Sequence, residues 1–184
     1  MNSTGNLKIC FMGGNQAGMV GALTLLSKGA EMLSAVSYTD DLTALLRSLR
    51  IPVHKSIKEK GFIEKLKISD LLVSVHGKEM VGEDLLKLPK FGAVNLHPYL
   101  YKYKGADPVG RALKDREFKA SVGAHLMEEK VDEGDVLAEE FIDVSGAKSV
   151  DEIYNRLYPC YSRVILKALD AIDIKAKNYA KDTA

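Results

Sequence analysis

Hydrophobic and polar residues alternate in blocks along the first hundred residues, where short apolar runs are followed by segments of helical period. Apolar runs of strand length predict five strands, at 7–12, 32–38, 52–54, 71–75 and 93–97. Segments whose apolar residues recur every three or four positions predict helices at 19–28, 40–50, 57–67 and 82–89. Strands that alternate with helices are typical of a mainly parallel sheet with helices on both faces.

The pattern changes after the fifth strand. Further segments are predicted as a helix at 108–115, strands at 121–128 and 135–144, and a long helix at 149–172. The two strands are joined by a turn-rich segment and are expected to form a pair. Pro159 is expected to kink or split the long helix, and the polar residues 173–184 are expected to fray in solvent. The predicted fold is α/β: a Rossmann-like open sheet with a C-terminal strand pair and a long final helix.

Length and composition predict one domain, because 184 residues with 46% hydrophobic content suffice for one sizeable core. We therefore expect a single domain over 1–184, with its core at about 7–172. The net charge of +1, from 26 basic and 25 acidic residues, favours neither nucleic acid nor an anionic membrane as a partner. The first apolar run is too short for a signal peptide, which favours a cytoplasmic protein. Two cysteines provide no metal-binding spacing and no disulfide framework, so no metal is expected.

The segment AVNLHPYLYKYKGADP, residues 93–108, carries the first candidate chemistry. Side chains alternate across a strand, so Asn95 and His97 project to one face while Val94 and Leu96 project to the other. They lie at the carboxyl end of a strand, where open α/β sheets bind ligands, and Pro98 ends the strand there. The alternative is that both polar groups only satisfy the backbone of the following loop.

A third polar group, Asp132, lies in a turn just after the strand that carries His125. An acid beside an imidazole sets its tautomer and raises its pKa. Asn95 can donate to a developing oxyanion, His97 can stabilise that charge or pass a proton, and Asp132 can orient His97, which suits acyl transfer. No Ser or Cys lies in a nucleophile-elbow context, so the attacking atom is expected to belong to a substrate. His125 is interpreted as a buried, hydrogen-bonded core residue.

Three motifs occur in a fixed order: NLHP at 95–98, KGADP at 104–108, and His125 separated by six residues from Asp132. In these motifs the chain resembles the folate-dependent formyltransferase family, which includes glycinamide ribonucleotide formyltransferase, the catalytic domain of methionyl-tRNA formyltransferase and the sugar N-formyltransferases. The resemblance implies that Asn95, His97 and Asp132 are catalytic. It also implies N10-formyltetrahydrofolate as the cofactor and an acceptor amine that attacks its formyl carbon.

The resemblance further implies a cofactor site at segment 73–81, which takes the place of the loop that holds the pterin largely through backbone groups. The candidates in this loop and in the turn expected to border the same pocket are His76, Gly77, Lys78, Met80, Val81, Glu133, Gly134 and Asp135. The alternative is that Gly77 only turns the chain and that Lys78 is solvated.

The glycine-rich loop after the first strand is a candidate acceptor site, because glycines and a following helix N-terminus can bind phosphate. It matches neither the dinucleotide-binding nor the P-loop motif, and the alternative is a tight strand-to-helix turn. Tyrosines after the fifth strand can stack on a sugar or a base, and a lysine there can meet an anion. The acceptor-binding candidates are Gly13, Gly14, Asn15, Tyr99, Tyr101 and Lys104.

The leading hypothesis is an N-formyltransferase acting on the amine of a small metabolite, such as an amino sugar or a sugar nucleotide. One alternative is a formyltetrahydrofolate hydrolase, in which water replaces the amine. Another is a folate-binding module without turnover. The final helix is expected to belong to the core, and a homodimer interface on it is the alternative.

Overall fold

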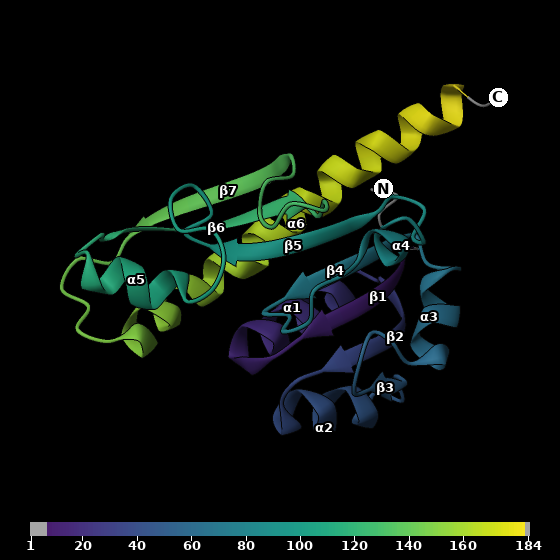
Figure 1. Ribbon diagram of the computed structural model, residues 1–184, viewed down its shortest axis with the longest axis horizontal. Coiled ribbons are helices and arrows are strands. Elements are labelled where there is room, and N and C mark those ends of the chain that lie inside the picture. The colour runs from purple at the N-terminus through teal and green to yellow at the C-terminus, as the bar shows by residue number, and fades with distance from the viewer. Residues whose placement is uncertain (1–6, 183–184) are drawn as a thin grey trace.

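The structure is a computed structural model that describes residues 7–182, with side chains described through residue 174. Its strands are β1 Lys8–Gly13, β2 Glu31–Ser37, β3 Val53–His54, β4 Leu71–Val75, β5 Ala93–Pro98, β6 Lys119–Leu126 and β7 Val136–Asp143. Its helices are α1 Asn15–Ser27, α2 Asp40–Ser48, α3 Lys60–Leu66, α4 Glu83–Leu86, α5 Pro108–Lys114 and α6 Val150–Asp182. The strands form one sheet in the order β3-β2-β1-β4-β5-β6-β7 (Figure 1).

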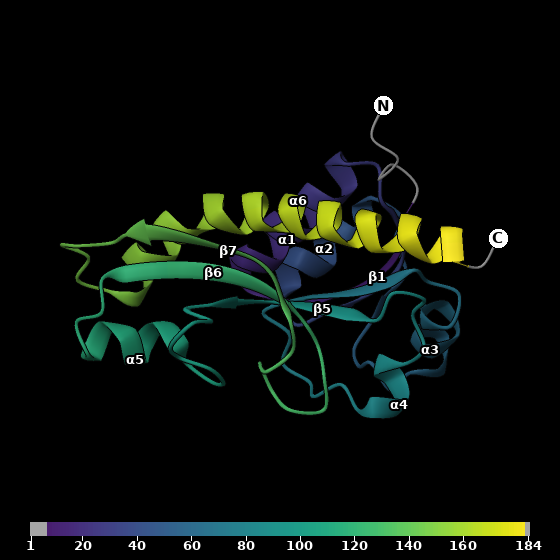
Figure 2. The same cartoon turned by 90° about the horizontal axis from the view of Figure 1, so that it is seen from above.

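Strands β1 to β5 pair in parallel, whereas β6 runs antiparallel to both β5 and β7. The predicted α/β fold, with its strand pair and long final helix, is confirmed. Helices α1, α2 and α6 cover one face of the sheet, and α3 and α4 cover the other (Figure 2). Each face has its own hydrophobic cluster, and the five residues of β4 are buried on both. Strands buried on both faces read as continuous apolar runs, which is why β4 was predicted at its observed bounds.

Helix α6 is one continuous element that contains Pro159 without being split by it. Its apolar stripe, with Ile153, Leu157 and Tyr161 fully buried, packs on the sheet and on α1. The helix extends beyond residue 172, where the sequence indicated a frayed tail, and continues to Asp182. Residues 183 and 184 lie outside the described residues. Residues 1–6, which belong to the N-terminal segment that was not expected to be a signal peptide, also lie outside them. Within the described part of the chain, no helix combines the length and hydrophobicity needed to cross a membrane.

The sheet topology brings three loops to one edge. The carboxyl ends of the parallel strands β1, β4 and β5 meet there, and β6 returns beside β5 with Asn95 paired to His125 and His97 paired to Gly123. The β6–β7 pairing shifts register between Ala124 and His125. Such a bulge adds local twist where strands end beside a site. The fold thereby places both strand-end polar residues next to the β6–β7 connection.

Candidate active site

The candidate active site is a cluster of polar side chains from β5 and from the loop between β6 and β7. The Nε2 atom of His97 lies 3.1 Å from Oδ2 of Asp132, and Nδ2 of Asn95 donates to Oδ1 of the same carboxylate at 3.4 Å. His97 and Asp132 are each 8% exposed. The structure therefore brings together the three residues that the sequence analysis singled out as catalytic.

The protonation of His97 follows from its neighbours. Its Nε2 faces two acceptors, the carbonyl oxygen of Gly105 at 3.0 Å and Oδ2 of Asp132, so Nε2 carries a proton and donates it. The Nδ1 atom is buried and has no hydrogen-bond partner in the described part of the structure. Because buried polar atoms are normally paired, Nδ1 is the atom of His97 on which a ligand can act.

A second imidazole contacts the same carboxylate. His125 is 2% exposed, and its Nε2 lies 3.2 Å from Oδ1 of Asp132 and 3.4 Å from Nδ2 of Asn95. Its Nδ1 donates to the carbonyl oxygen of Leu126 at 2.8 Å, so Nε2 donates to Asp132 in the imidazolium form of the ring, in which both nitrogens carry protons. The interpretation of His125 as buried and hydrogen-bonded is confirmed, but the residue also belongs to the polar cluster. Its place opposite Asn95 in the antiparallel pair is the signal that could have identified it.

The carboxylate of Asp132 is ionised at neutral pH. Burial is the largest influence and would raise its pKa, but the hydrogen bond from His125, the backbone N–H of Gly105 at 2.7 Å and the nearby imidazoles lower the pKa to about 2. The backbone of Asp132 is left-handed, with φ of 55°. Aspartate adopts this conformation more readily than bulky residues do. The turn thus aims a charged carboxylate at both imidazoles.

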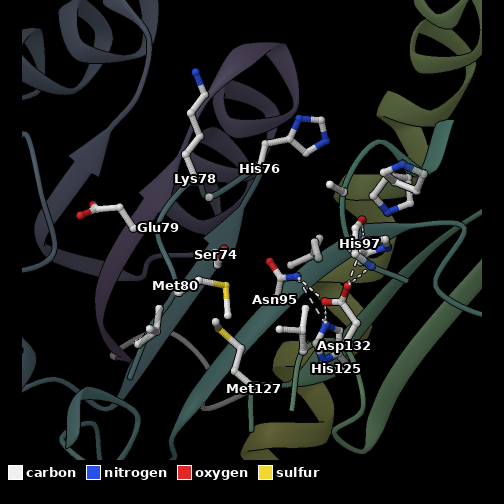
Figure 3. A pocket seen from close by; sticks show the side chains of 18 of the residues that line it. Ser74, His76, Lys78, Glu79, Met80, Asn95, His97, His125, Met127 and Asp132 are labelled. Atoms are coloured by element: carbon white, nitrogen blue, oxygen red, sulfur yellow. Dashed lines mark hydrogen bonds and ion pairs between the residues drawn. The ribbon is translucent and has the colours of Figure 1, made fainter. Parts of the chain in front are cut away.

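A cavity of about 440 Å³ opens beside this cluster (Figure 3), and this volume is in the range of small-molecule sites. Met80 and Met127 point toward one another across part of it. Its wall is formed by Asn15, Ser74, residues 76–81, residues 95–98, residues 105–108, His125, Met127, Glu128, Val131, Asp132 and Tyr154. The cavity is therefore built at the carboxyl edge of the parallel strands, as in other open α/β sheets.

All five candidates of the cofactor loop, His76, Gly77, Lys78, Met80 and Val81, line the cavity. The Nε2 atom of His76 lies 2.8 Å from the hydroxyl of Tyr161, and its ring packs edge-on against Tyr154. Burial lowers the pKa of His76 to about 4, so this side chain is neutral at pH 7. A Cβ atom at Gly77 would lie 2.6 Å from Met12 and 2.7 Å from Ser74, so Gly77 is also needed for close packing.

Glu133, Gly134 and Asp135 follow Asp132 in the β6–β7 loop but do not line the cavity. A Cβ atom at Gly134 would overlap the carbonyl oxygen of Leu126. The backbone N–H of Leu126 donates to the carbonyl oxygen of Asp135 at 2.9 Å. These contacts give the turn a structural part, which is to hold Asp132 in position.

Of the expected acceptor residues in the first loop, only Asn15 lines the cavity. Gly14 donates its backbone N–H to Val75 at 3.2 Å, and a Cβ atom at Gly13 would meet the Phe11 ring at 2.7 Å. These two glycines form a tight strand-to-helix turn, which was the alternative interpretation.

Tyr99, Tyr101 and Lys104 do not line the cavity either. Tyr99 is 0% exposed and donates its hydroxyl to the carbonyl oxygen of Glu117 at 3.1 Å, so it cannot stack on an acceptor. Its left-handed backbone, with φ of 54°, turns the side chain into the core as β5 ends. Tyr101 packs on Phe141 at a ring distance of 5.3 Å, and its hydroxyl donates to the backbone carbonyl oxygen of Lys119 at 2.8 Å.

Several lining residues were not proposed from the sequence as site residues: Ser74, Glu79, Ala106, Asp107, Pro108, Met127, Glu128, Val131 and Tyr154. Asp107 is the N-cap residue of α5. It accepts the N–H of Gly110 at 3.2 Å at the start of α5, and it also faces the cavity. For residues near strand ends, such as Ser74 in β4 and Met127 just after β6, strand position is a usable signal. Tyr154 on α6 carries no local signal.

Comparison with known proteins was made for sequence and for structure. Residues 52–169 match the sequence model of the family described as formyl transferase. Methionyl-tRNA formyltransferase from Fusobacterium nucleatum subsp. nucleatum is 28% identical over 144 residues, which cover 75% of this chain and 46% of that protein. The chain spans between 26% and 61% of the length of eight curated relatives that it matches.

Two solved structures illustrate the structural likeness. Phosphoribosylglycinamide formyltransferase from Streptococcus pneumoniae has a TM-score of 0.73 at 19% identity, covering 90% of this chain and 98% of that one. The sugar 3N-formyl transferase WlaRD, solved in the presence of dTDP and 5-N-formyl-THF, has a TM-score of 0.73 at 14% identity, covering 92% of this chain and 64% of that one. At these identities the likeness concerns the fold.

Proposed function

Because the chain belongs to the formyl transferase family, we propose that it is an N-formyltransferase that moves a formyl group from N10-formyltetrahydrofolate to an amine. The acceptor is a small metabolite such as an amino sugar or a sugar nucleotide. The observation that carries this proposal is the buried cluster of Asn95, His97 and Asp132 at the wall of a ligand-sized cavity. The net charge of +1 also favours a small molecule over nucleic acid as the acceptor.

The cavity has a volume typical of small-molecule sites, and its lining suits the proposed donor. Met80 and Met127 point toward one another, and thioethers make favourable contacts with aromatic rings such as a pteridine. Val81 and Val131 extend this apolar lining. Backbone groups of residues 76–81 supply hydrogen-bonding atoms along one wall. These residues would hold the ring system of the donor.

The bound donor would supply the formyl carbon and take back a proton at N10, so that one C–N bond forms at the acceptor as another breaks. The amide of Asn95 makes two long contacts of 3.4 Å, and one of its N–H groups can turn to a carbonyl oxygen that gains negative charge. His97 holds its Nε2 proton between Gly105 and Asp132, so its Nδ1 can take the proton that leaves the amine. Asp132 stabilises the imidazolium that results.

Two measurements test the proposed function. Binding of 5-formyltetrahydrofolate, a stable mimic of the donor, should raise the melting temperature in a concentration-dependent way, because it binds only the native state. Asp132→Asn should keep this shift, since asparagine tolerates the left-handed backbone, and should lower the rate of transfer by about 10²- to 10⁴-fold.

The absence of a shift at millimolar ligand would refute the donor assignment. Unchanged turnover of Asp132→Asn would refute the catalytic role of the carboxylate. Release of tetrahydrofolate at a rate that does not depend on added amine would identify a hydrolase instead.

A further inference from the structure

The methionines differ widely in their exposure to solvent. The chain has six methionines. Five of them lie in the described part of the structure: Met12, Met19, Met32, Met80 and Met127. Met80 is 70% exposed, whereas the other four are buried or partly buried. Among the described methionines, Met80 therefore offers its sulfur atom most readily to an oxidant in solution.

The two cysteines do not compete for such an oxidant. Cys10 and Cys160 are each 0% exposed. Burial raises the pKa of the Cys10 thiol to about 12, and it also raises the pKa of Cys160. Both thiols therefore stay protonated at neutral pH, whereas the thiolate is the form of cysteine that reacts with peroxide. Low doses of peroxide are thereby directed to methionine.

The backbone at Met80 is held in place by its two neighbours. The carboxylate of Glu79 accepts a hydrogen bond from Tyr38 at 3.0 Å and one from Ser56 at 2.6 Å. Val81 is 8% exposed and belongs to the hydrophobic cluster on the sheet face that α3 and α4 cover. An anchored residue thus precedes Met80 and a buried residue follows it. The backbone holds the exposed side chain beside the cavity.

The side chain of Met80 is part of the cavity wall. Figure 3 shows that Met80 and Met127 point toward one another, and both residues line the cavity. Met127 packs against the hydrophobic cluster beneath it, whereas Met80 is open to solvent. The more accessible of the two sulfur atoms therefore lies where the ring system of the donor would be held.

We propose that Met80 is a site of reversible oxidation by hydrogen peroxide and that this oxidation controls binding of the donor. Peroxide transfers one oxygen atom to the thioether, so that sulfur is oxidised to the sulfoxide and the peroxide is reduced to water. The sulfoxide replaces an apolar contact surface by a polar group. A bound donor covers the sulfur and protects it. This proposal rests on the proposed function and adds regulation to it.

Peptide mapping by mass spectrometry measures where oxygen is added. The full chain is treated with hydrogen peroxide, and the sulfoxide at each methionine is followed over time. Among the described methionines, Met80 should be oxidised at least about fivefold faster than Met19 or Met127, because its sulfur is more exposed. Equal rates at Met80 and Met19 would overturn the proposal.

The same mapping tests protection by the donor. Saturation with 5-formyltetrahydrofolate should slow the oxidation of Met80 at least about fivefold, because most molecules then carry the ligand. Oxidation of Met19, which does not line the cavity, should keep its rate. The rate at Met19 also corrects for peroxide that the ligand consumes. Equal slowing at both residues would overturn the proposal.

Calorimetry measures binding of 5-formyltetrahydrofolate before and after oxidation. Full conversion of Met80 to the sulfoxide should raise Kd about tenfold, because the polar group loses the contact between a thioether and an aromatic ring. The melting temperature without ligand should stay close to its original value, because Met80 is exposed. The two methionine sulfoxide reductases, each of which reduces one epimer, should together restore the original Kd. An unchanged Kd after full conversion would overturn the proposal.

Two variants locate the effect, each compared with its own untreated state. Met80→Leu removes the sulfur at similar volume, so peroxide should change its Kd by less than about twofold. Met19→Leu removes a sulfur from α1 outside the cavity, and peroxide should still raise its Kd by about tenfold. Equal responses of the two variants would assign the effect to another residue and overturn the proposal.

Failure of this proposal can be told apart from failure of the proposed function. If 5-formyltetrahydrofolate does not bind to the untreated protein, the donor assignment fails and this proposal fails with it. If the ligand binds equally well to the untreated and the oxidised protein, only this proposal fails.

Discussion

His125 places its Nε2 atom 3.2 Å from Oδ1 of Asp132, while His97 contacts the other oxygen of the same carboxylate at 3.1 Å. The carboxylate is therefore held from both sides. The hydrogen bond from His125 is the largest of the influences that lower the pKa of Asp132. His125 thus acts on His97 through a shared partner, as a positioning residue.

Replacing His125 should reduce turnover without removing donor binding. His125→Phe keeps a ring at this buried position but leaves Oδ1 of Asp132 without its imidazole donor. We expect kcat to fall by about 10- to 100-fold, which corresponds to the loss of a hydrogen bond to a buried charge. Steady-state kinetics with varied donor should show little change in KM.

If His125 had only a packing role, its two variants would give a different kinetic result. His125→Gln can still donate to the carboxylate, so it should recover part of the rate that His125→Phe loses. If both variants reduce kcat equally, and in proportion to a loss of melting temperature, the residue has only a packing role.

The second prediction concerns Glu79, which anchors the loop 76–81. Its carboxylate accepts from Tyr38 at 3.0 Å, from Ser56 at 2.6 Å and from the backbone N–H of Ile57 at 3.0 Å. Burial would raise its pKa, but these hydrogen bonds lower the pKa below the usual value. One wall of the cavity is thereby tied to the segment between β3 and α3.

Glu79→Gln should loosen this wall, because an amide cannot accept at both of its polar atoms. We expect KM for the donor to rise about tenfold while kcat stays within about twofold. The matched control is Glu83→Gln on α4, whose carboxylate is exposed and pairs with Lys87 at 2.5 Å. Equal changes in KM for the two variants would show that Glu79 does not position the loop.

The elements that were predicted at their observed positions are those whose secondary structure is determined by their own local sequence. Strand β4 is five apolar residues buried on both faces, and nothing outside the run is needed to recognise it. The far end of α6 is different, because its residues after Ile172 have no apolar period that distinguishes a helix from a tail. Pro159 does not split α6. Leu157 and Cys160, which lie near Pro159 in the helix, are fully buried, so tertiary packing outweighs the tendency of proline to interrupt a helix.

The site could be predicted where side-chain alternation applies. Asn95 and His97 share a face because they are two residues apart in a regular strand. The same reasoning fails at Tyr99, whose left-handed backbone interrupts the alternation and sends the ring into the core. Asp107 and Tyr154 reach the cavity through the packing of α5 against α6, which connects positions far apart in the sequence. Local sequence patterns therefore locate Asn95 and His97 at the end of β5 but do not locate Asp107 and Tyr154 in the cavity wall.

The third prediction concerns Gly134, where close approach of two backbone segments leaves no room for a side chain. A Cβ atom there would overlap the carbonyl oxygen of Leu126, so Gly134→Ala must displace the turn that carries Asp132. We expect a loss of about 1–3 kcal/mol in the free energy of unfolding and a parallel loss of kcat. The control is Gly61→Ala, in which the new Cβ meets the ring of His54 at 2.9 Å, and neither residue lines the cavity. A fully active Gly134→Ala protein would contradict the turn's part in holding Asp132.

The fourth prediction is a dependence of stability on pH that comes from His76. Burial, and secondarily the charge of His97, lowers its pKa from 6.5 to about 4 in the folded state. Below pH 6.5 the unfolded chain therefore binds a proton at His76, whereas the folded protein binds this proton only below about pH 4. The contribution of His76 to the free energy of unfolding is complete above pH 6.5. It decreases by about 1.4 kcal/mol per pH unit as the pH is lowered from 6.5 to about 4. His76→Asn tolerates the left-handed backbone at φ of 57° and should flatten the curve of unfolding free energy against pH in this window. Denaturant unfolding of both proteins between pH 4 and 7 measures the difference, and parallel curves would show that His76 titrates normally.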